Sequence, residues 1–421
     1  MALGWTGRFV TLDTPLRLQS SGDWWGEAEW WRREALREPG RMAAVNNRAN
    51  ALWLHGDLLE ALPEARRAVQ LAPGHHLPWR CLGNVLLDLG RFEQALEAYQ
   101  RSLELKDDPA TAFNCSKALL GLGRYEQAYR LAARRREDTA AHWQGFVEAR
   151  HLHLWGEQGL GDGIQHLRWM VPLLRRGVAV DLAVEPPLVG LIQAGLAWTG
   201  GSLTVRPLGE RPQAPLPACQ GPLLGLPLQL GFDQLLEPDP YLRLPVATPG
   251  ARQGRRPRIG VVWASGAFLD GGLLEREYRW KSLLGAPLRS CLNGLALRPV
   301  ELVSLQFGPD REPPEWIDCF SEELPADADL QATATWMLGL DLVISVDTAA
   351  AHLAGALGVP VWTLLPWAAA SRWQRQRRDT PWYPTMQLLR QPRHGDWYGL
   401  LQRLFAQLDL WLSDWPEPAE S

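Results

Sequence analysis

Two polar residues and the helix that follows them stand where a phosphorylated ligand would be bound. Asp347 and Thr348 come after the apolar run 342–346 and before the Ala-rich, helix-forming stretch 349–357. A helix N-terminus presents unpaired N–H groups and a partial positive charge to an anion. We expect Asp347, Thr348 and the backbone of residues 349–351 to face phosphate. An ordinary capped helix in a buried βαβ unit explains the same pattern.

Asp162 is the second candidate for chemistry. It lies in the glycine-rich segment 159–163, between a predicted strand at 151–155 and a predicted helix. The dipole and N–H groups of a helix N-terminus keep a carboxylate ionised. Such a group can act as general base toward a hydroxyl. An N-cap aspartate, with glycines that form a tight turn, explains the segment as well.

The same loop partly fits a dinucleotide-binding fingerprint. The third glycine of GxGxxG is replaced by Gln165, so the fingerprint fails. Asp181 and Glu185 stand about 20 residues further on, where an acid that binds ribose is expected. An oxidoreductase therefore remains a distant alternative.

Arg279 and Lys281 are candidate phosphate ligands, two cations that follow a predicted strand at 258–264. Lysine is rare here, since only three of the 43 basic residues are lysine. A solvated surface pair is the alternative for these two. Gln306 ends a predicted strand and is a candidate contact to ribose or base, or a plain polar strand end. His352 is more typical of a packed, hydrogen-bonded side chain than of a ligand.

Composition excludes several classes of protein. The net charge of −4 gives no reason to expect nucleic acid as a partner. No apolar run reaches the roughly 18 residues of a membrane-spanning helix, and the N-terminus lacks the pattern of a secretory signal. The five cysteines form no CxxC pair, which argues against zinc and fits a reducing cytosol. We expect a cytoplasmic protein with no metal and no cofactor.

A sequence repeat lies upstream of these motifs, from about residue 42 to 138. Gly56, Gly90 and Gly123 are 34 and 33 residues apart, and GRFEQA at 90–95 recurs as GRYEQA. This period, with its small and aromatic positions, resembles the tetratricopeptide repeat, in which stacked helix pairs bury their faces on one another. Such repeats offer a concave face to a peptide or protein, or serve as a rigid spacer.

The Trp-rich segment before the repeats has helical character. Trp24, Trp31 and Leu36 are predicted to form one apolar stripe that packs on the next domain.

After about residue 145, short apolar runs alternate with helical stretches, which predicts α/β layers. The predicted strands are 151–155, 178–184, 203–207, 258–264, 300–307, 342–346 and 361–365. The predicted helices are 164–177, 187–195, 330–340, 349–357 and 396–412.

Several motifs together resemble a known family. The segment GLGD at 159–162, the stretch SVDTAAAHLAGALG at 345–358 and the two-lobe layout resemble glycosyltransferase family 9, the ADP-heptose:lipopolysaccharide heptosyltransferases. EQGLGDGIQHLRW, SLQFGP, SRWQ and TPWYPT are more similar still to bacterial tetratricopeptide proteins with a family 9-like C-terminal region. The resemblance covers about residues 75–412.

The resemblance implies a GT-B fold, in which two Rossmann-like domains face each other across a cleft and the last helix crosses back to the first. It implies that Asp162 is the general base and that a basic residue near Lys281 holds the donor diphosphate. The Asp-Thr-x-x-x-His run of the family maps to Asp347, Thr348 and His352. Catalysis in this fold usually needs no metal. The glycine that the family often has after Asp-Thr is Ala349 here.

We therefore expect a helical repeat solenoid followed by a GT-B type α/β region. The expected domains are 1–41 (N-terminal helical segment), 42–140 (repeats), 145–245 (acceptor-side lobe), 255–395 (nucleotide-sugar lobe) and 396–413 (C-terminal helix).

The expected function is an inverting, metal-independent glycosyltransferase. It would use a nucleotide-diphosphate sugar and a protein, peptide or glycan acceptor recruited by the repeats. The alternative is a non-catalytic interaction or scaffold protein with a degenerate GT-B domain. The predicted donor-site residues are Lys281, Arg279, Asp347, Thr348, Ala349, Ala350, His352 and Gln306. The predicted acceptor-side loop comprises Gln158, Gly159, Gly161 and Gly163, next to Asp162.

Overall fold

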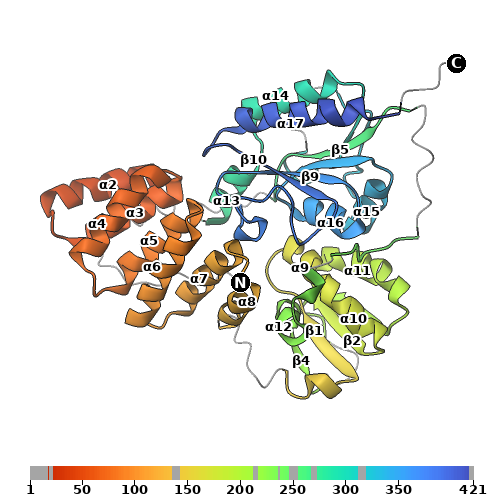
Figure 1. Cartoon of the computed structure of the whole chain (residues 1–421), viewed down its shortest axis with the longest axis horizontal. Coiled ribbons are helices and arrows are strands. Elements are labelled where there is room, and N and C mark those ends of the chain that lie inside the picture. Colours follow the sequence, from red (N-terminus) through yellow and green to blue (C-terminus); the bar gives the residue numbers. More distant parts are fainter. Residues whose placement is uncertain are drawn as a thin grey trace. The chain divides into compact units, whose positions relative to one another are not determined.

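The structure is a computed structural model of the chain (Figure 1). The residues described are 18, 22–134, 143–211, 217–235, 238–245, 255–266, 273–311 and 319–416. They divide into two compact units. The first contains residues 1–107 and 268–277, and the second contains residues 108–267 and 278–421.

Paired helices build the first unit. They are α2 (Trp24–Arg37), α3 (Met42–His55), α4 (Leu58–Leu71), α5 (His76–Asp88) and α6 (Phe92–Leu105). Helix α3 packs on α4 and α5 packs on α6, as the repeat predicts. The repeat glycines Gly56, Gly90 and Gly123 have φ angles of 112°, 68° and 71°. Each adopts the left-handed conformation that glycine tolerates best, which explains why glycine marks the period.

Gly83 shows why the second repeat needs a residue without a side chain. A Cβ atom at this position would lie 2.6 Å from the ring of Tyr99. That ring is fully buried, and its hydroxyl donates to Asn84 Oδ1 at 2.9 Å. Helices α5 and α6 therefore approach closely through a small residue on one and an aromatic ring on the other.

Helix α2 packs on α3 and extends the array toward the N-terminus. Its buried face is formed by Ala28, Trp31 and Ala35, at helical spacing. Leu36 is 65% exposed. The predicted stripe is therefore wrong in including Leu36, because Ala35 rather than Leu36 follows Trp31 by one helical turn.

The second unit begins with α7 (Pro109–Gly121) and α8 (Tyr125–Ala133), which the sequence assigns to the repeats. The repeat boundary predicted near residue 140 thus differs from the division at 107. Tyr129 of α8 explains the difference, since it is buried in the core of the first sheet and its hydroxyl lies 2.6 Å from His166 Nε2.

The first sheet of this unit has four parallel strands in the order β3-β2-β1-β4. The strands are β1 (His151–Trp155), β2 (Ala179–Val184), β3 (Leu203–Pro207) and β4 (Gln220–Pro222). Its helices are α9 (Leu160–His166), α10 (Met170–Arg175), α11 (Val189–Gly195) and α12 (Leu226–Leu230). The glycine-rich segment leads from β1 into α9, the position predicted for it.

The second sheet has six parallel strands in the order β10-β9-β8-β5-β6-β7. They are β5 (Arg258–Val262), β6 (Glu301–Ser304), β7 (Glu322–Glu323), β8 (Leu342–Val346), β9 (Val361–Leu365) and β10 (Met386–Arg390). Its helices are α13 (Leu273–Lys281), α14 (Gly285–Ala296), α15 (Leu330–Leu338), α16 (Ala349–Leu357) and α17 (Trp397–Ser413). Helices α14 and α17 lie on one face of the sheet, and α15 and α16 lie on the other (Figure 1).

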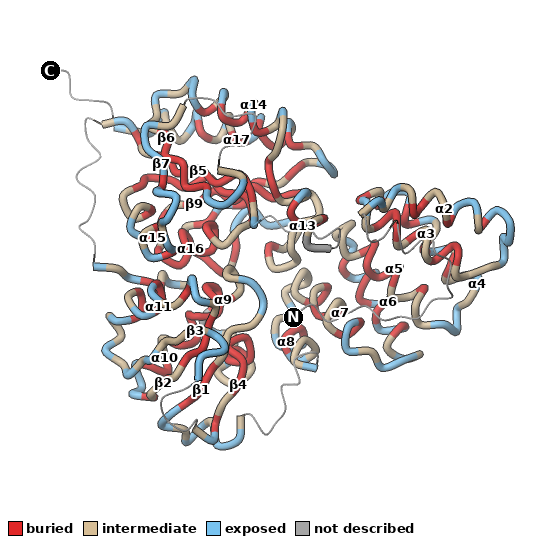
Figure 2. Tube along the Cα trace, turned by 180° about the vertical axis from the view of Figure 1, so that it is seen from behind, coloured by how far each residue is buried: buried red, intermediate tan, exposed pale blue. Residues whose placement is uncertain are grey.

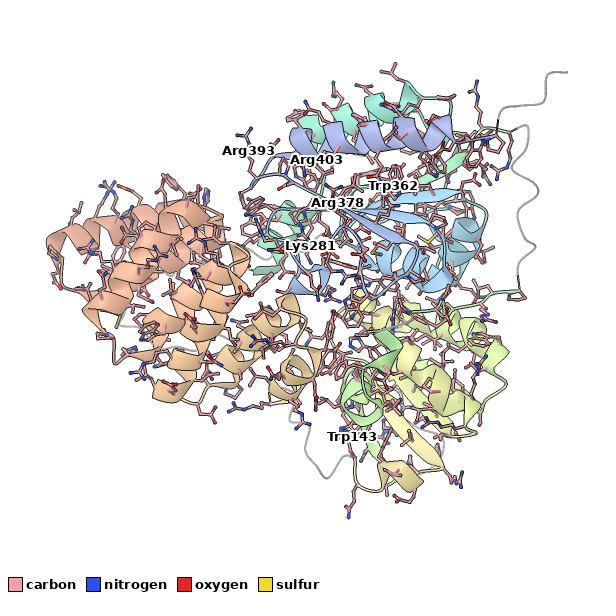
Figure 3. The ribbon with its side chains drawn as sticks, in the orientation of Figure 1. Trp143, Lys281, Trp362, Arg378, Arg393 and Arg403 are labelled. Atoms are coloured by element: carbon pink, nitrogen blue, oxygen red, sulfur yellow. The ribbon has the colours of Figure 1, made fainter. Side chains whose placement is uncertain are left out.

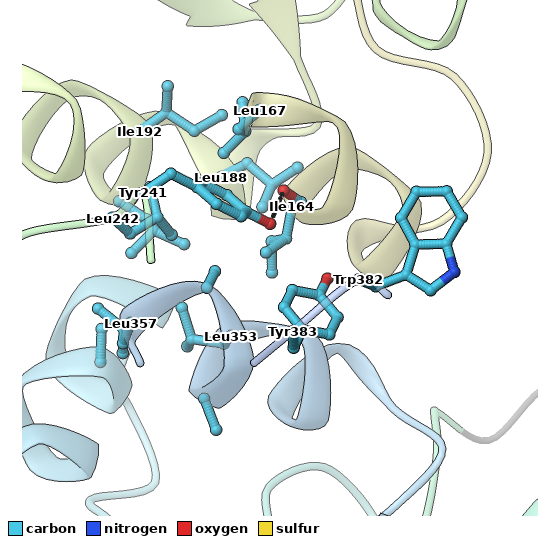
Figure 4. Close-up of a cluster of buried hydrophobic side chains, with 14 of the residues drawn as sticks. Ile164, Leu167, Leu188, Ile192, Tyr241, Leu242, Leu353, Leu357, Trp382 and Tyr383 are labelled. Atoms are coloured by element: carbon cyan, nitrogen blue, oxygen red, sulfur yellow. Dashed lines mark hydrogen bonds between the residues drawn. The ribbon is translucent and has the colours of Figure 1, made fainter. Parts of the chain in front are cut away.

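The two sheets share one hydrophobic core. Buried residues run from the strands of the first sheet through α9 and α11 to α16 and the segment around Trp382. Figure 4 shows this zone, with Ile164 and Tyr241 on one side and Leu353 on the other. In Figure 2 the buried colour follows the strands and the helices between the sheets. The predicted fold class, helical repeats followed by two Rossmann-like parallel sheets, is confirmed.

The last helix differs from expectation. The buried side chains of α17, Trp397, Leu400, Leu401, Leu404 and Leu408, belong to the core of the second sheet with α14. The prediction that this helix crosses back to the first lobe is wrong. The apolar face of α17 packs against α14 and β10 instead.

Helix length and composition also bear on membranes. Across the described residues, no helix has both the length and the apolar character that crossing a bilayer requires.

The contact at Gly83 leads to a stability prediction. Gly83→Val would force two methyl groups into the buried Tyr99 ring, and overpacking of this kind costs about 1–3 kcal/mol. Gly74→Val is the control, because a Cβ at Gly74 meets nothing within 4 Å. We expect urea unfolding followed by circular dichroism to show a loss for Gly83→Val and little change for Gly74→Val. Equal midpoints would contradict the packing described.

Candidate functional site

Helices α9 and α16 bring the two predicted lobes of the site together. Gly161, in the first turn of α9, lies under the ring of His352 of α16. A Cβ atom at Gly161 would be 2.7 Å from His352 Cδ2. Glycine at this position therefore lets the two helices approach, and it places Asp162 beside the N-terminal turns of α16.

Asp162 forms an ion pair with Arg372, which lies on the short turn η7 (Ser371–Trp373). The Arg372 Nη2 to Asp162 Oδ1 distance is 2.6 Å, and Arg372 Nη1 also donates to Gln165 Oε1 at 2.7 Å. Burial is the largest single effect and acts to raise the pKa of Asp162. The charge and hydrogen bond of Arg372, together with His166 and His352, outweigh it, and the pKa falls to about 2. Asp162 is thus ionised and paired at neutral pH.

His352 is a buried, neutral side chain. Its Nδ1 lies 2.8 Å from the hydroxyl of Tyr383, and its ring packs near Trp373. Burial, helped by the charge of Arg372, lowers the pKa of His352 to about 3. The packed, hydrogen-bonded role that the sequence favours for this histidine matches its surroundings.

Asp347 follows β8 at the carboxyl end of the strand, where ligands bind in open α/β sheets. The residue is 7% exposed, and its buried Oδ2 atom has no hydrogen-bond partner among the described residues. Lys281, labelled in Figure 3, is a cation near this carboxylate, with its Nζ atom 4.0 Å from Asp347 Oδ2. A buried carboxylate oxygen without a hydrogen bond is unusual in a folded protein.

Thr348 caps α16. Its hydroxyl accepts from the backbone N–H of Ala350 at 3.2 Å and lies 3.2 Å from the hydroxyl of Ser345. Ala349 is the first helical residue. The structure therefore places the Asp347–Ala350 segment as predicted, at the N-terminus of a nine-residue helix.

Two further arginines were not predicted from the sequence: Arg390, which lies near Asp347, and Arg375, which lies near Arg390. Arg390 ends β10, and its Nε is buried without a hydrogen-bond partner. Burial and the nearby charge of Arg375 lower its pKa to about 10, against the opposing effect of Asp347, so it remains charged at neutral pH. Arg375 lies over the ring of Trp367, 3.5 Å from the centroid. Neither Arg375 nor Arg390 stands in a motif that distinguishes it from the many other arginines.

Gln306 has a structural role rather than the predicted ligand contact. Its Oε1 accepts from the backbone N–H groups of Trp263 and Ala264 at 3.0 and 2.9 Å. Its Nε2 donates to the carbonyl oxygens of Ala264 and Phe307 at 3.3 and 3.0 Å. All hydrogen bonds of this amide are made to backbone groups that follow the neighbouring strands β5 and β6. We therefore correct the assignment of Gln306 as a donor-site residue.

Arg279 is separated from the cluster by helix geometry. It and Lys281 both lie on α13, two residues apart. Side chains at this spacing leave a helix on different faces. Arg279 is exposed, whereas Lys281 faces Asp347. The predicted paired grip on a diphosphate is therefore corrected to Lys281 alone.

The acceptor-side loop has the tight geometry that its glycines predict. Gln158 has a φ of 67°, a strained value for a residue with a side chain. Gly159 precedes α9 at its N-cap, and a Cβ at Gly163 would lie 2.9 Å from Leu188.

Asp181 is engaged within the first sheet. Its carboxylate lies 2.9 Å from His153 Nδ1 and 3.1 Å from Arg206 Nε. These partners on neighbouring strands occupy the carboxylate that a dinucleotide enzyme would need for ribose, which weakens the oxidoreductase alternative. Over the described ranges, no group of three or more His, Cys, Asp or Glu residues is arranged to hold a metal ion.

Comparison with known proteins supports the repeat assignment directly. Residues 78–109 match the model of the tetratricopeptide repeat family. A curated relative, Protein FlbA of Caulobacter vibrioides, is 27% identical over 373 residues, which cover 76% of this chain and 59% of the relative. The chain thus spans little more than half the length of that protein.

Solved structures similar to this chain include repeat proteins and glycosyltransferases. Crystalline MamA has 14% identity and a TM-score of 0.28, covering 30% of this chain and 77% of that one. The E. coli heptosyltransferase WaaC, with ADP-2-deoxy-2-fluoro heptose, has 13% identity and a TM-score of 0.41, covering 62% and 99%. A mutant O-GlcNAc transferase of Thermobaculum terrenum has 16% identity and a TM-score of 0.33, covering 95% and 91%. Scores and identities at this level assign no residue a role.

The buried, neutral His352 leads to a pH prediction. Its folded-state pKa of about 3 lies below the value of about 6.5 in the unfolded chain. Between these values the unfolded state binds more protons, so stability rises with pH. His352→Gln removes this contribution. We expect the slope of unfolding free energy against pH to fall by about 1.4 kcal/mol per pH unit between roughly pH 4 and 6.

The measurement is urea unfolding at a series of pH values. His394→Gln is the control, because it removes a histidine that is exposed rather than buried. An identical slope for the wild type and His352→Gln would show that His352 titrates normally.

Proposed function

We propose that the α/β unit binds a nucleoside diphosphate sugar and transfers the sugar, with inversion, to an acceptor hydroxyl. The observation that carries the proposal is the excess of partly buried positive charge at the N-terminus of α16. Four cations, Lys281, Arg372, Arg375 and Arg390, surround two carboxylates, Asp162 and Asp347. Such an excess is costly without an anion, and a diphosphate supplies one.

The diphosphate would lie against the first turn of α16. Its charge is complemented by Lys281, Arg390 and the N–H groups at the start of the helix. As the sugar–phosphate bond breaks, negative charge grows on the leaving phosphate. Cations fixed in a partly buried site stabilise that charge most effectively.

Asp347 would hold the sugar. Its buried Oδ2 has no hydrogen-bond partner among the described residues and can accept from a sugar hydroxyl. The Nζ atom of Lys281 lies 4.0 Å from the same oxygen. The pair thus joins sugar recognition to diphosphate binding.

Asp162 would act as the general base. The acceptor oxygen attacks the anomeric carbon, its proton passes to the Asp162 carboxylate, and the electron pair of the broken bond leaves with the nucleoside diphosphate. In the free protein Asp162 is a weak base, because Arg372 lowers its pKa to about 2. A diphosphate that draws Arg372 away removes this effect. Burial then raises the pKa of Asp162, so donor binding prepares the base.

The repeats would recruit the acceptor, since arrays of this kind use extended surfaces to bind protein segments. A scaffold without catalysis is the second candidate. The paired state of Asp162 and the core shared by the two sheets favour it.

Nucleotide binding tests the donor site. Ligands that bind only the native state raise its melting temperature. We expect UDP, GDP or ADP at millimolar concentration to raise the Tm of the wild type, and Lys281→Ala and Arg390→Met to lose that response. Arg279→Ala is the matched control on the same helix as Lys281 and retains it. No response of the wild type to any nucleoside diphosphate would remove the donor site and favour the scaffold.

Asp162→Asn separates binding from chemistry. The amide cannot accept the proton, and loss of a general base costs about 10²–10⁴-fold in rate. We expect the rate of sugar transfer to fall by at least about 10²-fold, while the nucleotide-induced rise in Tm persists. The assay follows release of nucleoside diphosphate in the presence of acceptor. Unchanged turnover would exclude Asp162 as the base.

A further inference from the structure

The repeat unit holds a buried arginine that comes from far along the chain. Arg276 lies in the first part of α13, among the residues that group with the repeats. It is 7% exposed and forms an ion pair with Asp88, which is 188 positions away in the sequence. The Cζ atom of Arg276 lies 4.4 Å from the centroid of the Trp53 ring. Arg276 is thus held by a carboxylate and by an aromatic ring.

The two holding residues belong to successive repeats. Trp53 lies in α3 and Asp88 ends α5, so each comes from the first helix of its repeat. The indole Nε1 of Trp53 donates to Asp88 Oδ2 at 2.7 Å, which fixes the carboxylate beside the ring. The site therefore exists only where two repeats stack.

The chemistry of this site selects a guanidinium group. A planar guanidinium can stack on an indole and, in the same position, bond to a carboxylate. The lysine ammonium is a strongly hydrated point charge without a planar face, so it satisfies the carboxylate but stacks less well. The Trp53–Asp88 pair is matched to arginine.

We propose that the Trp53–Asp88 pair is a recognition site for the arginine side chain of a partner protein segment, and that Arg276 fills it as an internal occupant. Two observations support exchange rather than a permanent clamp. Helix α13 is one continuous helix that spans the boundary of the two compact units, which falls between Glu277 and Tyr278. Successive repeats are also the elements that offer surfaces to protein segments. The partner is an arginine-bearing peptide segment that displaces Arg276.

Displacement of Arg276 bears on the donor site through α13. The end of the same helix carries Lys281, and the Tyr278 hydroxyl donates to Asp310 Oδ1 at 2.6 Å. This link rests on the proposed function, whereas the arginine site does not.

A labelled peptide tests the site in the full-length protein. The probe is a fluorescein-labelled peptide with the sequence of residues 273–281, and its counterpart carries lysine in place of Arg276. In fluorescence anisotropy without nucleotide, we expect Arg276→Ala to bind the probe at least tenfold more tightly than the wild type, because its site is vacant. The lysine peptide binds at least tenfold more weakly than the probe. Arg279→Ala, on the same helix, behaves as the wild type.

The double variant Arg276→Ala/Asp88→Asn loses the gain in affinity. Arg276→Lys keeps the ion pair but leaves the Trp53 ring uncovered. It replaces Arg276→Ala in the experiment if circular dichroism shows that Arg276→Ala does not fold. We expect Arg276→Lys to bind the probe more tightly than the wild type. Equal affinity of the wild type and both Arg276 variants would overturn the proposal and leave a permanent structural clamp. Binding that survives in the double variant would overturn it as well. Because no nucleotide is present, neither result depends on the glycosyltransferase proposal.

Discussion

The contact between Gly161 and the ring of His352 determines the site in the α/β unit. It sets the distance between α9 and α16, and these two helices carry Asp162 and the Asp347–Thr348 cap. A Cβ atom at Gly161 would lie 2.7 Å from His352 Cδ2, so a side chain there would force the ring or the helices to move. The neutrality of His352 follows from the same contact. The ring is buried between the helices, and a second positive charge beside Arg372 is disfavoured.

Charge in this region is balanced locally, one pair at a time, but not as a whole. Asp162 pairs with Arg372, and Asp347 faces Lys281. Arg390 donates to the backbone carbonyl groups of Trp373 and Gln374, and Arg375 lies over the Trp367 ring. Partly buried cations that are held by such weak acceptors are expected where an anion completes the structure. The shared core of the two sheets holds these groups in place from below, since Trp373 and Trp382 are both fully buried in it.

The best predicted part of the fold is the β8–α16–β9 unit, whose bounds follow the sequence pattern residue for residue. An apolar β-branched run, a capping threonine, an alanine-rich stretch and a terminal glycine all indicate the same local structure. Arg375 and Arg390 could not be found in this way, because arginine is common in this chain and tertiary packing alone selects these two. The role of Gln306 depends on backbone groups of a neighbouring strand, a long-range relation that local pattern does not contain. The path of α17 was mistaken for a similar reason, since an apolar face does not specify what covers it.

The position of Arg276 on the same chain as the repeats has a quantitative consequence for their recognition of partners. An occupant on the same chain competes as an intramolecular ligand, and short tethers give effective concentrations in the millimolar range. A single free arginine segment of equal intrinsic affinity would have to reach about that concentration to take its place. A partner present at lower concentration succeeds only if it contacts additional repeats. Competition from Arg276 therefore favours partners that contact several repeats over partners that contact only the Trp53–Asp88 pair.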